Sequence, residues 1–294
     1  MTTLTLFSPS GYVSKPAVLR RGVRHLQSLG FQVQVDESAL ARHQRFAGDD
    51  DTRLDAMQRV ADAAPSVAMA TRGGYGLTRL LDRIDWPRMA RSVERGTRWV
   101  GYSDVTALHL GLLAHGRVPS WAGPTVGDFG AEVPDDVTIP CFLEAMRGDL
   151  EVLGWRTAAG FDGLEAAGTL WGGNLTLVCS LLGTSHWPKV RGGILFLEDV
   201  NEHPYRAERC LLQLQQAGVI DAQKAVLLGH FNGWEPASND RGYTLKSAVQ
   251  ALQQRTRTPV LTGLPFGHVP TRVTLPVGQR VRLAVQGREV FMGW

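Results

Sequence analysis

Residues 97–113, TRWVGYSDVTALHLGLL, contain the segment that decides the fold. Trp99 and Val100 have strand character, residues 101–104 form a tight turn, and residues 105–113 have the apolar spacing of an amphipathic helix. A serine on such a strand-to-helix turn is held out of the sheet at the positive end of the helix. The backbone N–H of Asp104 would then point to where an oxyanion forms. The segment predicts an α/β fold and marks Ser103 as a candidate nucleophile.

A simpler interpretation of the same turn is a helix cap. The five-residue Gly-x-Ser-x-Gly signature of a nucleophile elbow is not met, because position 105 is Val. Ser103 and Asp104 are also common capping residues. The turn by itself leaves both interpretations open.

Strand-like and helical segments alternate through the first part of the chain. Residues 3–7, 31–35 and 66–70 have strand character, and Ser14 can cap a helix whose apolar residues recur at helical spacing. Strands joined by single helices predict a parallel, doubly wound sheet. Ligands of such sheets bind at the carboxyl ends of the strands, where both the glycine-rich run 72–76 and the Ser103 turn fall.

Composition excludes several classes of protein. Of 294 residues, 44% are hydrophobic and 20% are charged, and the net charge of +3 comes without a basic run interleaved with aromatics. We therefore expect no nucleic-acid partner. The apolar runs are too short to cross a bilayer. Three widely spaced cysteines and a start without a secretory signal predict a cytoplasmic protein.

The second part of the chain has its own pattern. We expect an N-terminal α/β domain over 1–130, a turn-rich linker region over 131–163, and a C-terminal domain over 164–294. Apolar strands are predicted at 194–197 and 225–228, a helix at 205–217, and antiparallel strands between 271 and 294.

Three features offer chemistry. The N–H groups of the glycine-rich run 72–76 could bind an anion, although a tight turn explains the glycines equally well. Glu198 ends an apolar strand, where a carboxylate can orient a histidine or simply cap the next segment. Of eight histidines, His268 stands in a Gly/Pro-rich loop that suits a positioned base, with His230 as its rival. No zinc-ligand spacing is present, so we expect no metal and no cofactor.

The chain resembles the LD-carboxypeptidases, serine peptidases that trim the tetrapeptide stems of peptidoglycan fragments. Five segments carry the resemblance, in the order of the family: 72–76 (RGGYG), 101–104 (GYSD), 171–175 (WGGNL), 197–202 with 204–206 (LEDVNE and PYR), and 263–268 (GLPFGH). The resemblance implies a flavodoxin-like N-terminal domain and a smaller C-terminal α/β domain. It assigns Ser103 as the nucleophile, Glu198 as the acid and His268 as the base.

The resemblance also implies the remaining site residues. Backbone N–H groups of Gly74 and Asp104 would bind the oxyanion. Because a carboxypeptidase must bind a free C-terminal carboxylate, Arg72 and the N–H groups of the glycine loop, including that of Gly73, are candidates for that contact. Glu202 is the rival of Glu198, which we prefer because a strand end holds a side chain more rigidly than a loop.

The expected activity is release of the terminal D-alanine from peptidoglycan-derived tetrapeptides during murein recycling. The expected partner is a small peptide or muropeptide, with no nucleic acid and no membrane, and we expect a homodimer. One alternative is a microcin-immunity-type peptidase acting on acyl-sulfamoyl adenylates. Another is a peptide-binding protein without catalysis.

Overall fold

The computed structural model describes residues 2–294, which form two compact units. Unit 1 comprises the chain up to Asp149 together with Gly183–Pro188 and Pro270–Gly278. Unit 2 comprises Leu150–Leu182, Lys189–Val269 and Gln279–Trp294.

Unit 1 is built on a six-stranded sheet with the order β11-β5-β4-β3-β1-β2. All neighbouring strands are parallel except for β11, which pairs with β5 in the antiparallel sense. The predicted parallel sheet is confirmed. Its strands are β1 (Thr2–Phe7), β2 (Phe31–Val35), β3 (Val67–Ala70), β4 (Arg98–Gly101), β5 (Ser120–Ala122) and β11 (Leu275–Val277).

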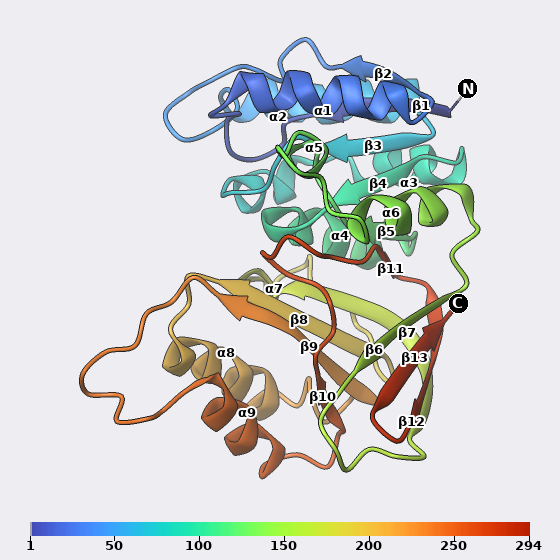
Figure 1. The fold of residues 1–294 in the computed structure, drawn as a ribbon. Helices are drawn as coiled ribbons and strands as arrows, with labels where there is room; N and C mark the ends of the chain where they lie inside the picture. Colours follow the sequence, from blue (N-terminus) through green and yellow to red (C-terminus); the bar gives the residue numbers. More distant parts are fainter. Residues whose placement is uncertain (1) are drawn as a thin grey trace. The chain divides into compact units, whose positions relative to one another are not determined.

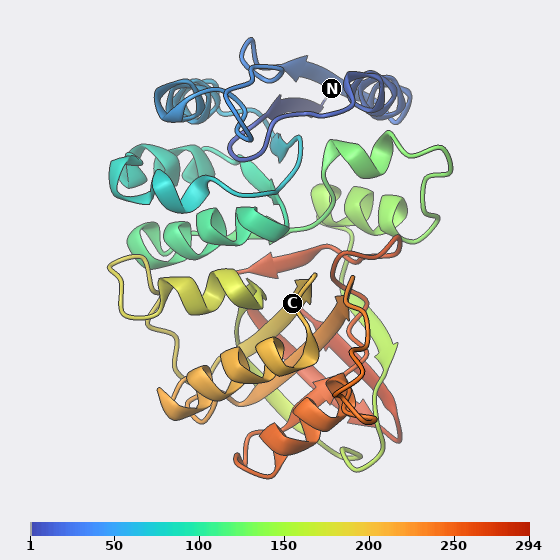
Figure 2. The ribbon, with the colours of Figure 1, turned by 90° about the vertical axis from the view of Figure 1, so that its left-hand side faces the viewer.

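Helices cover both faces of this sheet. Helices α1 and α5 pack together on one side, and α2 and α3 pack together on the other (Figure 2). The helices of unit 1 are α1 (Pro16–Ser28), α2 (Asp50–Ala63), α3 (Trp86–Glu94), α4 (Thr106–Gly111), α5 (Val126–Phe129) and α6 (Thr138–Arg147). Short helical turns are η1 (Leu77–Arg79), η2 (Leu81–Arg83), η3 (Ser103–Val105) and η4 (Leu112–Gly116).

The expected cap of the first helix is wrong in one detail. The N-cap of α1 is Lys15, without a capping side chain, and Pro16 occupies the first turn. Proline starts a helix well because its φ is already helical and it has no N–H to satisfy. Ser14 therefore lies one residue too early to cap.

Strand burial explains why unit 1 folds as a doubly wound sheet. All four residues of β3 are buried, because helices cover both of its faces. Phe7 at the end of β1 packs edge-to-face on Trp99 of β4, with ring centroids 5.1 Å apart. This core positions the carboxyl ends of β1, β3 and β4, whose loops carry the site.

Unit 2 contains a seven-stranded mixed sheet with the order β10-β9-β8-β7-β12-β13-β6. The strands from β10 to β7 are parallel, and those from β7 to β6 are antiparallel. The predicted antiparallel strands near the C-terminus are confirmed. The strands are β6 (Val152–Arg156), β7 (Glu165–Asn174), β8 (Ile194–Val200), β9 (Ala225–Asn232), β10 (Val260–Thr262), β12 (Arg280–Gln286) and β13 (Glu289–Gly293).

Three helices accompany this sheet: α7 (Leu175–Leu181), α8 (Pro204–Gln216) and α9 (Leu245–Gln253). Helices α8 and α9 pack against each other on one side of strands β8 and β9 (Figure 1). The region expected as a linker, 131–163, contains α6 and β6. Within residues 2–294, no helix is long and apolar enough to span a membrane.

Candidate active site

Ser103 lies where β4 turns into the η3 helical turn. Its φ of +64° is in the left-handed region, which a non-glycine residue adopts only when the surroundings enforce it. The residue is half-buried. The turn thus has the strained strand-to-helix geometry expected of a nucleophile elbow.

The glycine loop after β3 packs directly against this serine. A Cβ added to Gly73 would lie 2.7 Å from the Ser103 Cβ and 2.9 Å from its Oγ, so only glycine fits. Gly74 follows with a φ of +112°. Among residues 2–294, no acceptor receives a hydrogen bond from the backbone N–H of Gly74 or Asp104. Both donors are available to an anion beside Ser103.

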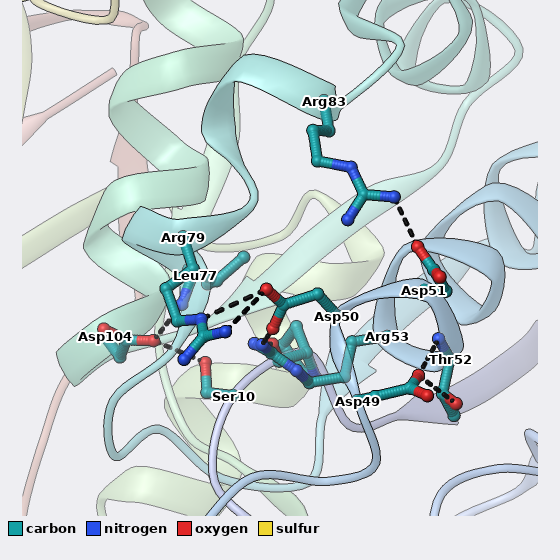
Figure 3. Close-up of polar contacts among 11 residues, drawn as sticks. Ser10, Asp49, Asp50, Asp51, Thr52, Arg53, Leu77, Arg79, Arg83 and Asp104 are labelled. Atoms are coloured by element: carbon teal, nitrogen blue, oxygen red, sulfur yellow. Dashed lines mark hydrogen bonds and ion pairs between the residues drawn. The ribbon is translucent and has the colours of Figure 1, made fainter.

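The carboxylate of Asp104 joins three loops of unit 1. Its Oδ2 accepts hydrogen bonds from the Ser10 hydroxyl at 2.6 Å and from the Leu77 backbone N–H at 2.9 Å (Figure 3). The side chain is fully buried, and its Oδ1 has no partner among the described residues. Burial raises the pKa of the Asp104 carboxyl, although both hydrogen bonds oppose the shift. Asp104 thereby ties the nucleophile turn to the loops after β1 and β3.

A buried arginine supports the same loops. Arg53 on α2 is fully buried, pairs with Asp50, and donates to the Pro9 carbonyl at 2.9 Å. Arg79 donates to the same Asp50 carboxylate at 2.9 Å and 3.1 Å (Figure 3). Gly76 makes room for this cation, because a Cβ there would meet the Arg53 guanidinium at 2.5 Å. Burial lowers the pKa of Arg53.

His109 fixes the end of β4 from behind. Its Nε2–H donates to the Gly101 carbonyl at 2.9 Å, because a carbonyl can only accept. Its Nδ1 then accepts from the Ser120 hydroxyl at 2.9 Å. Full burial lowers the pKa of His109 to about 4, so the ring is neutral at pH 7. Through these two hydrogen bonds, His109 links β4 to β5.

Two arginines lie near the serine turn in unit 1. Arg72 is exposed, and its guanidinium donates to the Tyr12 carbonyl at 3.2 Å. Arg272 is buried, pairs with Asp128, and places its Cζ 4.2 Å above the centre of the Tyr102 ring. The second arginine, from the segment 270–278, was not predicted from the sequence.

In unit 2, the carboxylate of Glu198 meets His268. The His268 Nδ1–H donates to Glu198 Oε2 at 2.8 Å, since a carboxylate can only accept. Glu198 is fully buried, whereas the His268 side chain is 19% exposed. This arrangement leaves Nε2 of His268 as the acceptor that can take up a proton.

Neighbouring polar groups hold Glu198 in place. The Asn174 amide donates to Glu198 Oε1 at 3.3 Å and to Asp199 Oδ1 at 2.8 Å. Asp199 in turn accepts from the Thr176 N–H and hydroxyl at the start of α7. The two adjacent carboxylates therefore have different roles: Glu198 contacts the histidine, and Asp199 accepts hydrogen bonds from the first turn of α7, whose N-cap is Asn174.

The two rival residues lie elsewhere. Glu202 is paired with Arg206 at 3.8 Å, one helical turn along the chain. His230 is exposed at the end of β9, where its backbone N–H donates to the Phe266 carbonyl at 2.8 Å. Among residues 2–294, no group of three or more His, Cys, Asp or Glu side chains is placed to hold a metal ion.

The structure thus places the candidate residues in two sets. Unit 1 holds Ser103, Asp104, Gly73, Gly74 and Arg72, and unit 2 holds Glu198 and His268. From the sequence, Asp104 was considered as an oxyanion donor or a helix cap; the contact of its carboxylate with Ser10 and that of Asn174 with Glu198 were missed. Both missed residues follow a strand, Ser10 after β1 and Asn174 at the end of β7, and this position was the available signal.

The chain matches known proteins along most of its length. Residues 4–123 match the LD-carboxypeptidase N-terminal domain, and residues 167–283 match the LD-carboxypeptidase C-terminal domain. A relative from Synechocystis sp., named "putative carboxypeptidase", is 33% identical over 284 residues, 95% of this chain and 90% of its own. The murein tetrapeptide carboxypeptidase of Pseudomonas aeruginosa is 28% identical over 293 residues, 94% of this chain and 91% of its own.

Solved structures share the fold. The muramoyltetrapeptide carboxypeptidase from Oxalobacter formigenes superimposes with a TM-score of 0.90 at 37% identity, covering 99% of this chain and 98% of its own. The microcin C7 self-immunity protein MccF, in complex with aspartyl sulfamoyl adenosine, gives 0.87 at 23% identity, covering 100% and 96%. The second likeness is one of fold alone. With both domains matched in order and a 33% identical relative along its length, the chain belongs to the LD-carboxypeptidase family of serine peptidases.

Proposed function

We propose that this protein is a serine carboxypeptidase that releases the terminal D-alanine from murein tetrapeptides. The observation that carries the proposal is the 2.8 Å hydrogen bond between His268 and the fully buried Glu198. A buried carboxylate on Nδ1 orients an imidazole and stabilises the imidazolium that forms when Nε2 takes a proton. The names of the relatives from Pseudomonas aeruginosa and Oxalobacter formigenes support the substrate.

Each proposed role follows from the chemistry of the side chain. Ser103 Oγ attacks the carbonyl carbon before the terminal D-alanine, and its proton passes to His268 Nε2. The tetrahedral oxyanion accepts hydrogen bonds from the N–H groups of Gly74 and Asp104. The His268 imidazolium then protonates the departing amine of D-alanine. Water, deprotonated by His268, hydrolyses the acyl-enzyme and restores Ser103.

A carboxypeptidase must also bind a free carboxylate next to the scissile bond. Arg72 is exposed beside the glycine loop, and its guanidinium presents paired donors to a carboxylate. The Gly73 N–H belongs to the same loop. We assign both to the terminal carboxylate of the substrate.

The test is a Ser103→Ala variant with Ser28→Ala, an exposed serine of α1, as the matched control. Each protein is incubated with a murein tetrapeptide, and D-alanine release is followed by mass spectrometry. We expect turnover to fall by several orders of magnitude in Ser103→Ala and to be unchanged in Ser28→Ala. Near-normal release by a folded Ser103→Ala protein would refute a serine mechanism.

A second candidate substrate is an acyl-sulfamoyl nucleoside. It is favoured by an aromatic cluster in unit 2, where His203 lies 4.6 Å from Tyr205 and 5.4 Å from Trp234 between ring centroids. Asn232, two residues before Trp234, donates to the His268 carbonyl at 2.6 Å, so the same chain segment contacts the residue of the proposed base. Cleavage of aspartyl sulfamoyl adenosine, lost in Trp234→Ala, would establish this activity; no cleavage would exclude it.

We further propose that the protein works in the cytoplasm as a homodimer. The three cysteines are free thiols, which is typical of a reducing compartment. Cell fractionation tests the compartment, and light scattering after size-exclusion chromatography tests the dimer. A mass equal to one chain at micromolar concentration would contradict the homodimer.

A further inference from the structure

Three exposed arginines of unit 1 lie in the glycine loop 72–76 or contact tyrosines in or next to it, and we call Arg42, Arg45 and Arg72 the arginine rim. The Arg42 guanidinium carbon lies 4.4 Å above the centre of the Tyr12 ring. The corresponding carbon of Arg45 lies 5.4 Å above the Tyr75 ring. Cation–π stacking of this kind restricts a long side chain without using its hydrogen-bond donors.

Backbone contacts join this rim to the loop beside Ser103. The Tyr12 N–H donates to the Arg45 carbonyl at 3.2 Å, and the Gly11 N–H donates to the Gly73 carbonyl at 3.2 Å. Gly73 packs against Ser103, as described above. The rim therefore borders the nucleophile turn within a single unit.

The rim has no carboxylate within ion-pair distance among residues 2–294, although Arg45 acts at longer range on the buried Asp104 carboxyl and opposes the rise of its pKa. The nearby acidic run at the start of α2 is engaged elsewhere (Figure 3): Asp50 with Arg53 and Arg79, and Asp51 with Arg83. The third, Asp49, caps its own helix through Thr52.

One terminal carboxylate needs only one guanidinium, so two cations of the rim are in excess. We propose that Arg42 and Arg45 bind a second carboxylate of the substrate, separate from the terminal carboxylate at Arg72. This inference rests on the proposed function and extends it: Arg42 and Arg45 are specificity-determining residues that recognise a further carboxylate of the murein peptide. Planar guanidinium groups held on tyrosine rings are preorganised for bidentate contact with a carboxylate.

A pair of double variants tests the residues. R42A/R45A removes the two stacked arginines, and R20A/R24A removes two exposed arginines of α1 with the same change of charge. For a tetrapeptide containing diaminopimelate, we expect R42A/R45A to raise KM about tenfold with kcat within twofold. R20A/R24A should leave both constants unchanged. An equal change in both double variants would mean that only net charge matters and would overturn the proposal.

Matched peptides identify the carboxylate. One peptide carries an amide in place of the side-chain carboxylate of diaminopimelate, and another an amide in place of the free carboxylate of the second residue. The wild type should discriminate about tenfold against one of them, and R42A/R45A should not discriminate. Equal KM values of the wild type for all three peptides would overturn the proposal.

A binding measurement separates this proposal from the proposed function. Calorimetry on the Ser103→Ala protein gives Kd for the same three peptides without turnover. If wild-type protein releases no D-alanine but Ser103→Ala still prefers the fully acidic peptide, the proposed activity is refuted and the proposed carboxylate binding by the arginine rim is supported. If D-alanine is released while Kd is the same for all three peptides, the rim is wrong and the activity stands.

Discussion

The Asp104 carboxylate accepts a hydrogen bond from the Leu77 backbone N–H, so the residue after the proposed nucleophile is tied to the loop that carries Gly73 and Gly74. The bond is 2.9 Å long and fully buried. It links two loops whose N–H groups are both proposed to bind the same oxyanion. The relative position of the two donors therefore depends on a side chain that does not itself contact the substrate.

Asp104→Ala should weaken both folding and turnover. It leaves the buried Ser10 hydroxyl and Leu77 N–H without an acceptor, which costs roughly 2–5 kcal/mol of unfolding free energy. A displaced oxyanion donor lowers kcat by about 10²-fold, with little change in KM. Asp104→Asn keeps an acceptor oxygen at this place and should recover most of both losses. Urea unfolding and steady-state kinetics measure them, and equal kcat values for the two variants would contradict the positioning role.

The buried imidazole of His109 should make stability depend on pH. Its pKa is lowered from 6.5 to about 4, so between these values the unfolded chain binds a proton that the folded chain does not. Stability is therefore lost as pH falls through this window, by roughly 3 kcal/mol. His109→Gln keeps a donor for the Gly101 carbonyl but cannot titrate. The wild-type and variant unfolding free energies, measured between pH 4 and 7, should converge at low pH; parallel curves would contradict the assignment.

Ser103→Gly should stabilise the folded protein relative to Ser103→Ala. The φ of +64° strains any side chain with a Cβ but not glycine. We expect a gain of about 1 kcal/mol in unfolding free energy, reduced somewhat by the greater entropy of glycine in the unfolded chain. Both variants should be inactive. If Ser103→Gly is the less stable of the two, the turn is not strained.

Glu198→Gln and Glu202→Gln should differ strongly in their effect. Gln keeps the volume of Glu198 but removes the charge that would stabilise the His268 imidazolium. We expect kcat to fall by about 10⁴-fold, the loss known for the equivalent change in a serine protease triad. Glu202 is paired only with Arg206, so Glu202→Gln should change kcat less than threefold, in line with the small energy of an exposed ion pair. Comparable losses in both variants would contradict the assignment of Glu198.

The fold class and the positions of most strands could be predicted because they follow from local pattern. The composition of residues 31–35 and 225–228 predicts strands. The alternation of strands with helices along the chain predicts a parallel sheet. The contact between Glu198 and His268 could be suggested, since both residues follow apolar strands. The two residues are 70 positions apart in the sequence, so whether their side chains come within hydrogen-bond distance depends on the tertiary packing.

Other parts of the site could not be predicted, because their surroundings come from distant segments. Arg53 stands in the polar sequence Asp50-Asp51-Thr52-Arg53, which is typical of an exposed helix start, yet it is fully buried. Its burial depends on the missing side chain of Gly76 and on the carbonyl of Pro9. Asp104 likewise finds Ser10 across 94 residues of sequence. Nothing local to either position signals these partners.

The edge strand β11 affects how the chain folds and which fragments of it can be stable. It pairs with β5 through residues 275–277, so the sheet of the first unit is completed by a segment that is synthesised more than 100 residues after the rest of that sheet. Until then β5 has an open edge, and open edges recruit strands from other chains. A fragment ending near residue 149 would keep that edge permanently and lack the contact of Arg272 with the face of the Tyr102 ring. Cutting the gene between the two matched domains should therefore yield an N-terminal piece that aggregates, whereas a circular permutation that keeps residues 270–278 should remain monodisperse.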